Sequence, residues 1–122
     1  MELKDRVAVI TGGASGLGKA TAEQVIAAGG KVAIFDLNEE LARATAKELG
    51  PDAAAFEVNV AEEASVQAAV AGTMERFGAI HANVNCAGIG AAARTLGKEG
   101  AMPLKTFEFV IGVNLIGTFN TL

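Results

Sequence analysis

Three glycines between an apolar run and a helical pattern could hold a phosphate group. The sequence Thr11-Gly12-Gly13-Ala14-Ser15-Gly16-Leu17-Gly18 follows the apolar run 7–10 and precedes a helix-like stretch from Lys19 to Ala28. Glycine lets the backbone pass close to an anion, and the N–H groups and dipole at a helix start favour negative charge. This spacing predicts a phosphate-binding turn between a strand and a helix.

An acidic residue lies where a nucleotide ribose would need one. Asp36 ends a second apolar run, 31–35, and follows Gly18 by 18 positions, near the roughly 20 positions typical of such a residue. A carboxylate accepts hydrogen bonds from both ribose hydroxyls and repels a 2′-phosphate. No Lys or Arg occupies positions 14–17 or 37–40. We therefore expect half of a dinucleotide site, with NAD favoured over NADP.

Composition excludes several classes of protein. The chain has 122 residues, of which 51% are hydrophobic and 20% charged, so we expect one folded domain. A net charge of −4 argues against a nucleic-acid or membrane partner, and no apolar run approaches the roughly 18 residues of a membrane span. One Cys and one His make a disulfide framework or a protein-built zinc site unexpected. Without a signal-peptide pattern, a cytoplasmic location is expected.

The apolar periodicity predicts alternating strands and helices. Strands are expected over 6–11, 31–36, 54–58 and 80–85, and helices over 16–28, 39–49 and 62–77, with Asn38 capping the second helix. A loop is expected over 89–102, followed by a helix from Leu104 to the last residue. Right-handed crossovers place the strands in the order 3-2-1-4. The predicted fold class is α/β: a Rossmann-type, doubly wound parallel sheet in three layers, α/β/α.

This sheet would leave apolar surfaces without partners. A doubly wound sheet contains two βαβαβ halves, and 122 residues cover one half and the start of the next. The outer edge of strand 80–85 would have no neighbour, although its sequence suits a central strand. We expect an incomplete fold: the N-terminal part of a longer protein, or a chain that covers these surfaces by association. The last helix offers Phe107, Val110, Ile111, Leu115 and Phe119.

Polar and small residues follow the third and fourth strands. Asn85-Cys86-Ala87-Gly88 would let the backbone approach a ligand at the carboxyl end of a parallel strand. Cys86 is interpreted as a ligand contact or a core residue, not as a nucleophile. Asn59 follows the third strand and offers one carbonyl acceptor, or alternatively closes the turn before the next helix.

Two further polar residues lie within apolar stretches. Asn114 is expected in the middle of the last helix, where its amide needs a hydrogen-bond partner. It is either a site residue or an Asn satisfied between helices. His81, in the fourth predicted strand, is interpreted as structural and is given no role in the site.

Three motifs together resemble the short-chain dehydrogenase/reductase family. They are 11–18 (the family's Thr-Gly-x3-Gly-x-Gly), 85–88 (its Asn-Asn-Ala-Gly) and Val113-Asn114-Leu115. Within the family, the chain is most similar to the type 2 3-hydroxyacyl-CoA dehydrogenases, which have an insertion similar to the segment between Gly88 and Phe107. The resemblance implies hydride transfer between NAD and a secondary alcohol or ketone, with an acyl-CoA as a candidate substrate. It also implies a homo-oligomer, as family members commonly form tetramers.

The resemblance also implies roles for individual residues. Asn114 matches an Asn that bends a helix and holds a water beside the catalytic lysine. Arg94, Lys98 and Lys105 could meet CoA phosphates or form a solvated rim. Asn59 stands where the family has an Asp that receives the adenine amino group, so the contact can survive without the charge. The residues expected to contact NAD are Gly12, Ser15, Gly16, Leu17, Gly18, Asp36, Leu37, Asn59, Val60, Cys86, Ala87 and Gly88.

Apart from Asn114, which the resemblance makes the one candidate catalytic residue, the family's catalytic triad cannot be assigned to this chain. The family uses Ser, Tyr and Lys, the last two as Tyr-x3-Lys, because the Lys lowers the pKa of a phenol that is otherwise a poor base. The chain has no Tyr, and its serines are Ser15 and Ser65. Three hypotheses follow: the cofactor-binding part of an NAD-dependent oxidoreductase, a module that binds a dinucleotide without catalysis, or a structural fragment that associates through its last helix.

Overall fold

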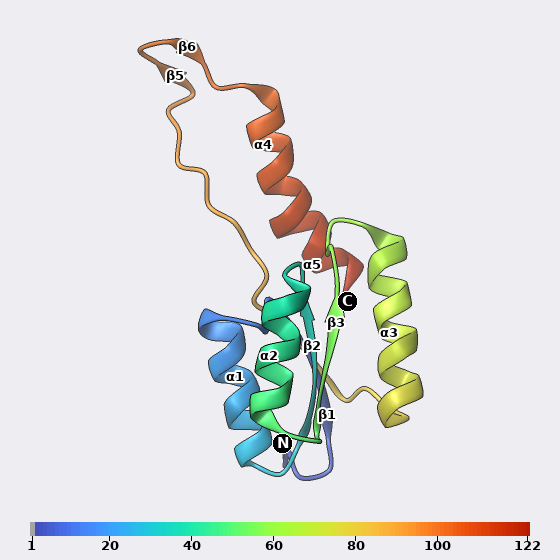
Figure 1. Ribbon diagram of the computed structural model, residues 1–122. Helices are drawn as coiled ribbons and strands as arrows, with labels where there is room; N and C mark the ends of the chain where they lie inside the picture. Colours follow the sequence, from blue (N-terminus) through green and yellow to red (C-terminus); the bar gives the residue numbers. More distant parts are fainter. Residues whose placement is uncertain (1) are drawn as a thin grey trace.

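A parallel sheet of four strands organises the chain. The computed structural model describes residues 2–122 (Figure 1). Its strands are β1 (Val7–Thr11), β2 (Lys31–Asp36), β3 (Ala53–Glu57) and β4 (Ala82–Asn85). They run parallel in the order β3-β2-β1-β4, which confirms the predicted topology. All four carboxyl ends therefore lie at one edge of the sheet.

Helices cover both faces of this sheet, as predicted. Helices α1 (Gly16–Ala27) and α2 (Glu39–Leu49) lie on one side and α3 (Glu63–Phe77) on the other (Figure 1). The side chains of β1 and β2 alternate between the two faces: Ile10 and Ile34 pack in the core on the α1 side, and Val9 and Phe35 in the core on the α3 side. Burial on both faces explains why these strands are continuous apolar runs.

The predicted helix ends are close to the observed ones. Asn38 caps α2, since its side chain accepts a hydrogen bond from the Leu41 N–H at 3.0 Å. Gly78 ends α3 in the left-handed conformation with φ of 79°. The strand bounds differ more: β3 begins one residue earlier than expected, and β4 begins at Ala82 instead of position 80.

His81 therefore lies just before β4 and not inside it. Its Nδ1 accepts the Val7 N–H at 3.0 Å, while its own backbone N–H donates to the Val7 carbonyl at 2.8 Å. The imidazole thus satisfies a backbone donor at the start of β1. This geometry agrees with the structural role expected for His81.

The segment after β4 departs from the prediction. The expected loop over 89–102 contains a small antiparallel hairpin, β5 (Leu96–Gly97) and β6 (Gly100–Ala101). Figure 1 shows that this hairpin and α4 (Leu104–Ile111) stand away from the sheet. Strands of two residues carry no readable periodicity, so local sequence could not predict them. Among residues 2–122, no helix combines the length and hydropathy that a membrane span requires.

The last helix is also different from the expected one. After α4 the backbone continues as a π-helical stretch, η1 (Gly112–Ile116), and a short α5 (Gly117–Asn120). The helix ends at Asn120 and does not run to the last residue. Side chains of β4 engage the residue that follows: Asn83 donates to the Thr121 carbonyl at 2.8 Å, and the Thr121 hydroxyl donates to Asn85 at 2.6 Å. These contacts give the last turn partners outside the helix.

Candidate functional site

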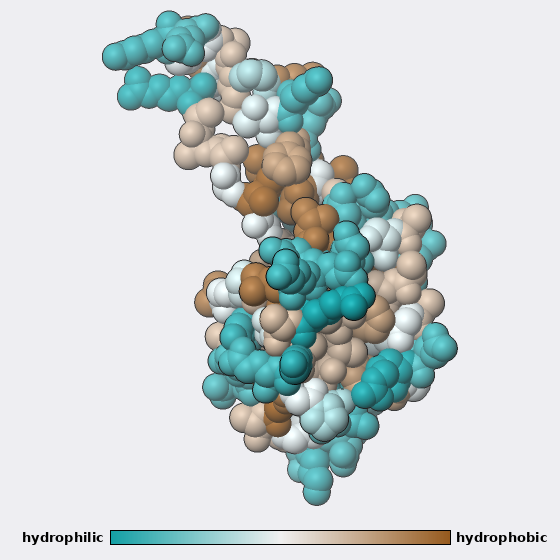
Figure 2. All heavy atoms as spheres, viewed as in Figure 1, coloured by the Kyte–Doolittle hydropathy of each residue, from teal (hydrophilic) through white to brown (hydrophobic). Residues whose placement is uncertain are grey.

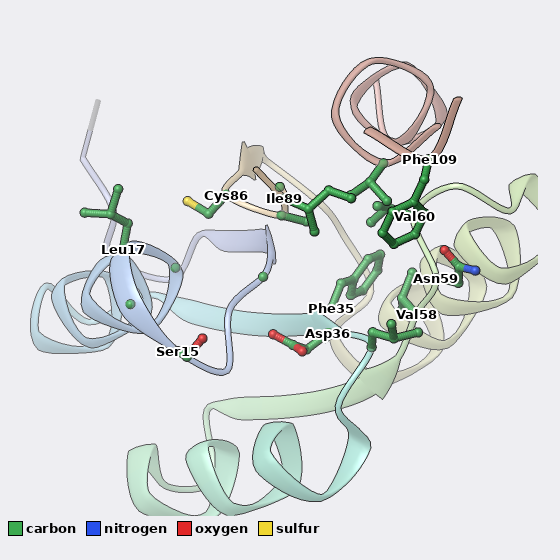
Figure 3. Close-up of a pocket in the computed structure, with 17 residues that line it drawn as sticks. Ser15, Leu17, Phe35, Asp36, Val58, Asn59, Val60, Cys86, Ile89 and Phe109 are labelled. Atoms are coloured by element: carbon green, nitrogen blue, oxygen red, sulfur yellow. The ribbon is translucent and has the colours of Figure 1, made fainter. Parts of the chain in front are cut away.

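A cavity of about 490 Å³ lies at the carboxyl ends of the strands (Figure 3). Its position is the one at which open parallel sheets usually bind ligands. All twelve residues predicted to contact a cofactor line it, although they come from four separate parts of the sequence. The complete lining is Gly12, Ser15, Gly16, Leu17, Gly18, Phe35, Asp36, Leu37, Val58, Asn59, Val60, Cys86, Ala87, Gly88, Ile89, Phe109 and Val113.

The glycine turn between β1 and α1 is closely packed on one side and open on the other. A Cβ on Gly18 would overlap the carbonyl of Gly12, and one on Gly12 would come within 2.9 Å of the Ala87 backbone nitrogen. Gly16, by contrast, has φ of +53° and open space where a Cβ would stand. The first N–H groups of a helix have no partners within it. The turn therefore offers backbone donors to an anion in the cavity.

Asp36 links the end of β2 to the same turn. Its Oδ2 accepts the Ala14 N–H at 3.1 Å and its Oδ1 accepts the Asn38 N–H at 3.0 Å. A carboxylate oxygen can accept more than one hydrogen bond, so both oxygens retain capacity for hydroxyl donors in the cavity. Among the described residues that line the cavity, none is Lys or Arg. The carboxylate is thus the charge that an incoming ligand meets.

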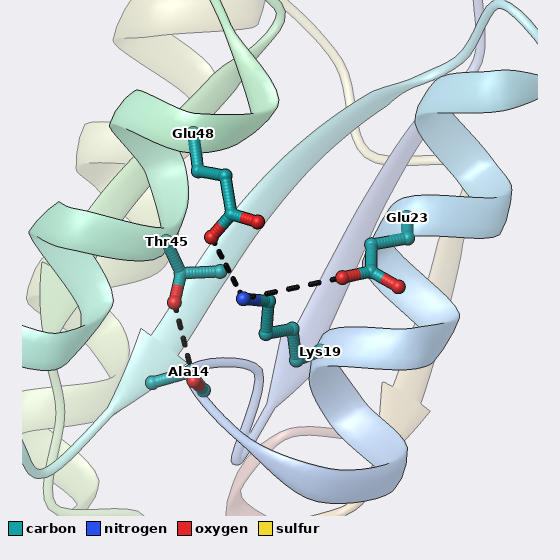
Figure 4. A network of polar contacts seen from close by, with 5 residues as sticks. All are labelled: Ala14, Lys19, Glu23, Thr45 and Glu48. Carbon is teal, nitrogen blue, oxygen red and sulfur yellow. Dashed lines mark hydrogen bonds and ion pairs between the residues drawn. The ribbon is translucent and has the colours of Figure 1, made fainter.

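Helix α2 supports the turn from outside the cavity (Figure 4). The buried Thr45 hydroxyl donates to the Ala14 carbonyl at 3.2 Å. The Lys19 ammonium donates to Glu48 at 2.7 Å and lies 4.0 Å from Glu23. The hydrogen bond to Glu48 raises the pKa of Lys19 above its ordinary value, against a smaller lowering by desolvation. Ala14, although it contributes no ligand donor itself, is therefore held from β2 and from α2.

Thr11 positions the turn that follows β4. Its buried hydroxyl accepts the N–H groups of Cys86 at 3.2 Å and Ala87 at 3.1 Å. It also donates to the Asn85 side chain at 3.3 Å. One side chain of β1 thereby holds the backbone of Cys86 and Ala87 against the cavity. Cys86 is a free, half-buried thiol that lines the cavity, and its contact with a cofactor stays a prediction.

Asn59 both lines the cavity and closes the turn before α3. Its side-chain oxygen accepts the Ala61 N–H at 3.1 Å, and its amide nitrogen donates to Glu62 at 2.9 Å. Its backbone N–H donates to the Ser65 hydroxyl at 3.0 Å. The turn-closing role expected for Asn59 is therefore observed, and its role as an acceptor for a ligand stays a prediction.

Asn114 lies beside the cavity but not in its lining. Its side-chain oxygen accepts the Ile89 N–H and its amide nitrogen donates to the Ile89 carbonyl, both at 2.8 Å. The residue lies within η1 and is exposed. Its amide is thus satisfied by a loop residue and not by a neighbouring helix. The observed effect of Asn114 is to hold Ile89 next to the turn 85–88.

Five lining residues were missed by sequence reasoning. Phe35, Val58 and Ile89 each lie next to a predicted residue, and extending each motif by one position would have found them. Phe109 and Val113 lie four apart on the last helix, so they share one face. No local signal shows that this face meets the cavity, because the contact depends on where the segment 89–103 places the helix. The five complete an apolar wall, and no metal-binding cluster of His, Cys, Asp or Glu occurs within residues 2–122.

Comparisons with known proteins agree with this geometry. The family model for short chain dehydrogenases matches residues 6–122. The 3-hydroxyacyl-CoA dehydrogenase type-2 of Bos taurus is 46% identical, over 98% of this chain and 47% of that protein. The sorbitol dehydrogenase of Cereibacter sphaeroides is 38% identical, over 97% of this chain and 44% of that protein. The chain spans about half the length of the curated relatives it matches.

A solved structure has the same fold. The 3-ketoacyl-(acyl-carrier-protein) reductase from Brucella melitensis, complexed with NADH, superposes with a TM-score of 0.89 at 35% sequence identity. The match covers 98% of this chain and 48% of that chain. The fold described above is therefore shared with this reductase.

Proposed function

The chain belongs to the short-chain dehydrogenase family, and from this premise we propose that the protein is an NAD-dependent oxidoreductase. Residues 1–122 are its NAD-binding domain in this proposal. The reaction is hydride transfer between NAD and a secondary alcohol or ketone. The observation that carries the proposal is the single cavity in which the glycine turn, Asp36 and the turn 85–88 meet.

The residues present fit a nicotinamide dinucleotide. The open side of Gly16 and the N–H groups at the start of α1 suit a pyrophosphate, and the Asp36 carboxylate suits two ribose hydroxyls. Cys86, Ala87 and Ile89 give a largely apolar wall on the β4 side of the cavity. The cofactor, when bound, supplies a carbon centre that gives or takes a hydride.

NAD is proposed over NADP on the basis of Asp36. A 2′-phosphate on the ribose would bring a second negative group to this carboxylate, and no Lys or Arg among the described lining residues would offset the repulsion. The Brucella reductase is complexed with NADH, which supports this assignment.

A 3-hydroxyacyl-CoA is the proposed substrate. The support is the name shared by the relatives that are 40–46% identical. Sorbitol dehydrogenase is a more distant relative at 38% identity. Within this chain, the apolar side chains of Ile89, Phe109 and Val113 line the cavity and suit an acyl chain. The proton transfer is not assigned to a residue here, since the chain has no Tyr.

Association between copies is also proposed. Phe107, Phe109, Leu115 and Phe119 have between 52% and 74% of their surface exposed. Figure 2 shows apolar side chains gathered over the helical segment that joins the hairpin to the body. Exposed apolar patches of this kind mark protein interfaces. Light scattering coupled to gel filtration tests the association: a single species with the mass of one chain at all concentrations contradicts it.

Dinucleotide binding without turnover is the second candidate for these 122 residues. The observation that favours it is the absence of Tyr from the sequence, because the family's proton donor is a Tyr. The two candidates predict the same binding and differ in activity alone.

One pair of measurements tests both. The chain is titrated with NADH, and binding is followed by the fluorescence of the reduced nicotinamide. It is then assayed for NADH oxidation with a short 3-ketoacyl-CoA. Saturable binding supports the site, and turnover in addition supports the oxidoreductase for this chain itself. Binding without turnover supports the second candidate, and no binding contradicts both.

A further inference from the structure

We infer that Glu62 is a positioning residue that orients the amide of Asn59, and through it selects a dinucleotide whose base carries an amino group. The inference rests on the proposed function, since it concerns the base end of the same site. Nothing in the glycine turn or in Asp36 distinguishes one purine from another. That choice needs a polar group further along the sheet.

The order of the sheet places the base next to Asn59. The phosphate-binding turn follows β1, Asp36 ends β2, and β3 is the next strand outward. Val58, Asn59 and Val60 directly follow β3 and line the same cavity. A nucleotide with its phosphate at α1 and its ribose at Asp36 therefore extends its base toward positions 58–60. Val58 and Val60 provide apolar surface there, and Asn59 provides the polar group.

Two neighbours determine which way the Asn59 amide points. Its oxygen accepts the Ala61 N–H at 3.1 Å, and its nitrogen donates to the Glu62 carboxylate at 2.9 Å. Reversing the amide would set its NH₂ group against the Ala61 N–H and its oxygen against the carboxylate, so both contacts would become repulsive. An ionised carboxylate can only accept. Glu62 therefore permits a single orientation.

This orientation presents an acceptor to the cavity. In Figure 3 the oxygen of Asn59 lies on the side of Phe35 and Val60, and the nitrogen lies on the far side. An amide oxygen has two lone pairs, of which the Ala61 N–H uses one. The other can accept from a base. Adenine carries an amino donor at C6, whereas hypoxanthine carries an oxo group there, which would face oxygen with oxygen.

The experiment compares two probes that differ in this edge of the base: hypoxanthine has an oxo group in place of the C6 amino group, and it carries a proton on N1. The full chain is titrated with NADH and with its hypoxanthine analogue, and the fluorescence of the reduced nicotinamide reports both. We expect NADH to bind about three- to tenfold more tightly, the effect of one neutral hydrogen bond. In Glu62→Gln the new amide can donate or accept, so only the Ala61 N–H still favours the observed orientation of Asn59, and the preference for NADH should fall.

Two further variants separate orientation from general effects. Glu63→Gln removes the same charge one residue along, from a side chain that contacts Gln67 and not Asn59, and should keep the preference. Asn59→Asp in the Glu62→Gln background should restore it, because either carboxylate oxygen can accept. A merely structural role of Glu62 would not be rescued in this way.

Each outcome has a distinct meaning. If neither probe binds, the proposed function fails and the inference with it. If both bind equally well to the unmodified chain, the function stands and the inference is wrong. It is also wrong if Glu62→Gln keeps the preference, or if Glu63→Gln loses it to the same degree.

Discussion

The Asp36 carboxylate accepts the backbone N–H of Ala14 at 3.1 Å, so the residue that ends β2 also holds the turn that precedes α1. The same carboxylate lines the cavity. One side chain therefore couples the shape of the glycine turn to the position of the ribose in the proposed function. This coupling makes Asp36 the first residue to change.

Replacing Asp36 by Ala should weaken NADH binding and reduce the preference over NADPH. A hydrogen bond to a charged group contributes about 1.5–3 kcal/mol, so we expect a loss of roughly ten- to a hundredfold in NADH affinity. NADPH should lose less, because the repulsion of its 2′-phosphate disappears with the carboxylate. Fluorescence titration with both cofactors measures this. Asp52→Ala, at an exposed position outside the cavity lining, is the control, and an unchanged NADH:NADPH ratio in Asp36→Ala contradicts the assignment.

Gly18→Ala should unfold the turn, although Ala is the better helix former. Intrinsic propensity alone predicts a gain of about 1 kcal/mol. The overlap of the new Cβ with the Gly12 carbonyl instead predicts a loss, of about 1–3 kcal/mol by analogy with overpacked cores. Chemical denaturation measures whether the free energy of unfolding rises or falls in Gly18→Ala.

Gly16→Ala should be milder than Gly18→Ala, because open space surrounds its Cβ. Its φ of +53° still costs an L-residue about 1–2 kcal/mol. Gly90→Ala meets neither a neighbour nor a positive φ and is the control. Denaturation curves in which all three variants coincide would show that the turn is not packed as described.

Thr45→Val should lower both stability and cofactor affinity. The hydroxyl that donates to the Ala14 carbonyl is buried, and loss of such a donor costs about 1–3 kcal/mol. Thr73→Val is the matched control, since the buried Thr73 hydroxyl donates within its own helix to Ala69. Thr73→Val should lower stability and leave the NADH affinity unchanged. Thermal melts measure the stability of both variants, and titrations measure their NADH affinity. Equal NADH affinities of the two variants would show that Thr45 does not act on the turn.

The contribution of Lys19 to stability should disappear at alkaline pH. Its hydrogen bond to Glu48 raises the pKa of Lys19 above the ordinary 10.5, so the folded state holds this proton more tightly than the unfolded state. The stabilisation is complete below pH 10.5 and is lost as the pH rises through the folded-state pKa. Lys19→Met should have a slightly lower melting temperature than the unmodified chain at neutral pH. This difference in melting temperature should disappear at alkaline pH.

Added salt and a second variant test the origin of the difference in melting temperature between Lys19→Met and the unmodified chain. The pair is exposed, so added salt should also narrow it. Glu23→Gln should have a smaller effect than Lys19→Met, because Glu23 lies 4.0 Å from the ammonium and Glu48 only 2.7 Å. A gap that is constant from neutral to alkaline pH would assign the effect to packing of the Lys19 chain instead.

By itself, the sequence determined the sheet, its order and most of the cavity. The runs 7–10 and 32–35 are apolar throughout because both faces of the sheet are buried there, and this pattern is local. The glycine turn and Asp36 lie within a short βαβ unit, so their spacing along the chain determines their spacing in space. The predicted contacts at 59–60 and 86–88 lie in the same cavity because they follow β3 and β4, whose carboxyl ends meet the ends of β1 and β2 at one edge of the sheet.

Only the tertiary structure decided the contacts between residues that lie far apart in the sequence. Asn114 bonds to Ile89 across 25 positions, and Thr45 to Ala14 across 31; no periodicity records contacts between such distant residues. The hairpin 96–101 has strands too short for a pattern, and the place of Phe109 and Val113 in the cavity depends on that hairpin's path. The orientation of the Asn59 amide likewise depends on two neighbours meeting it in space, because an amide has no intrinsic preference between its two ends.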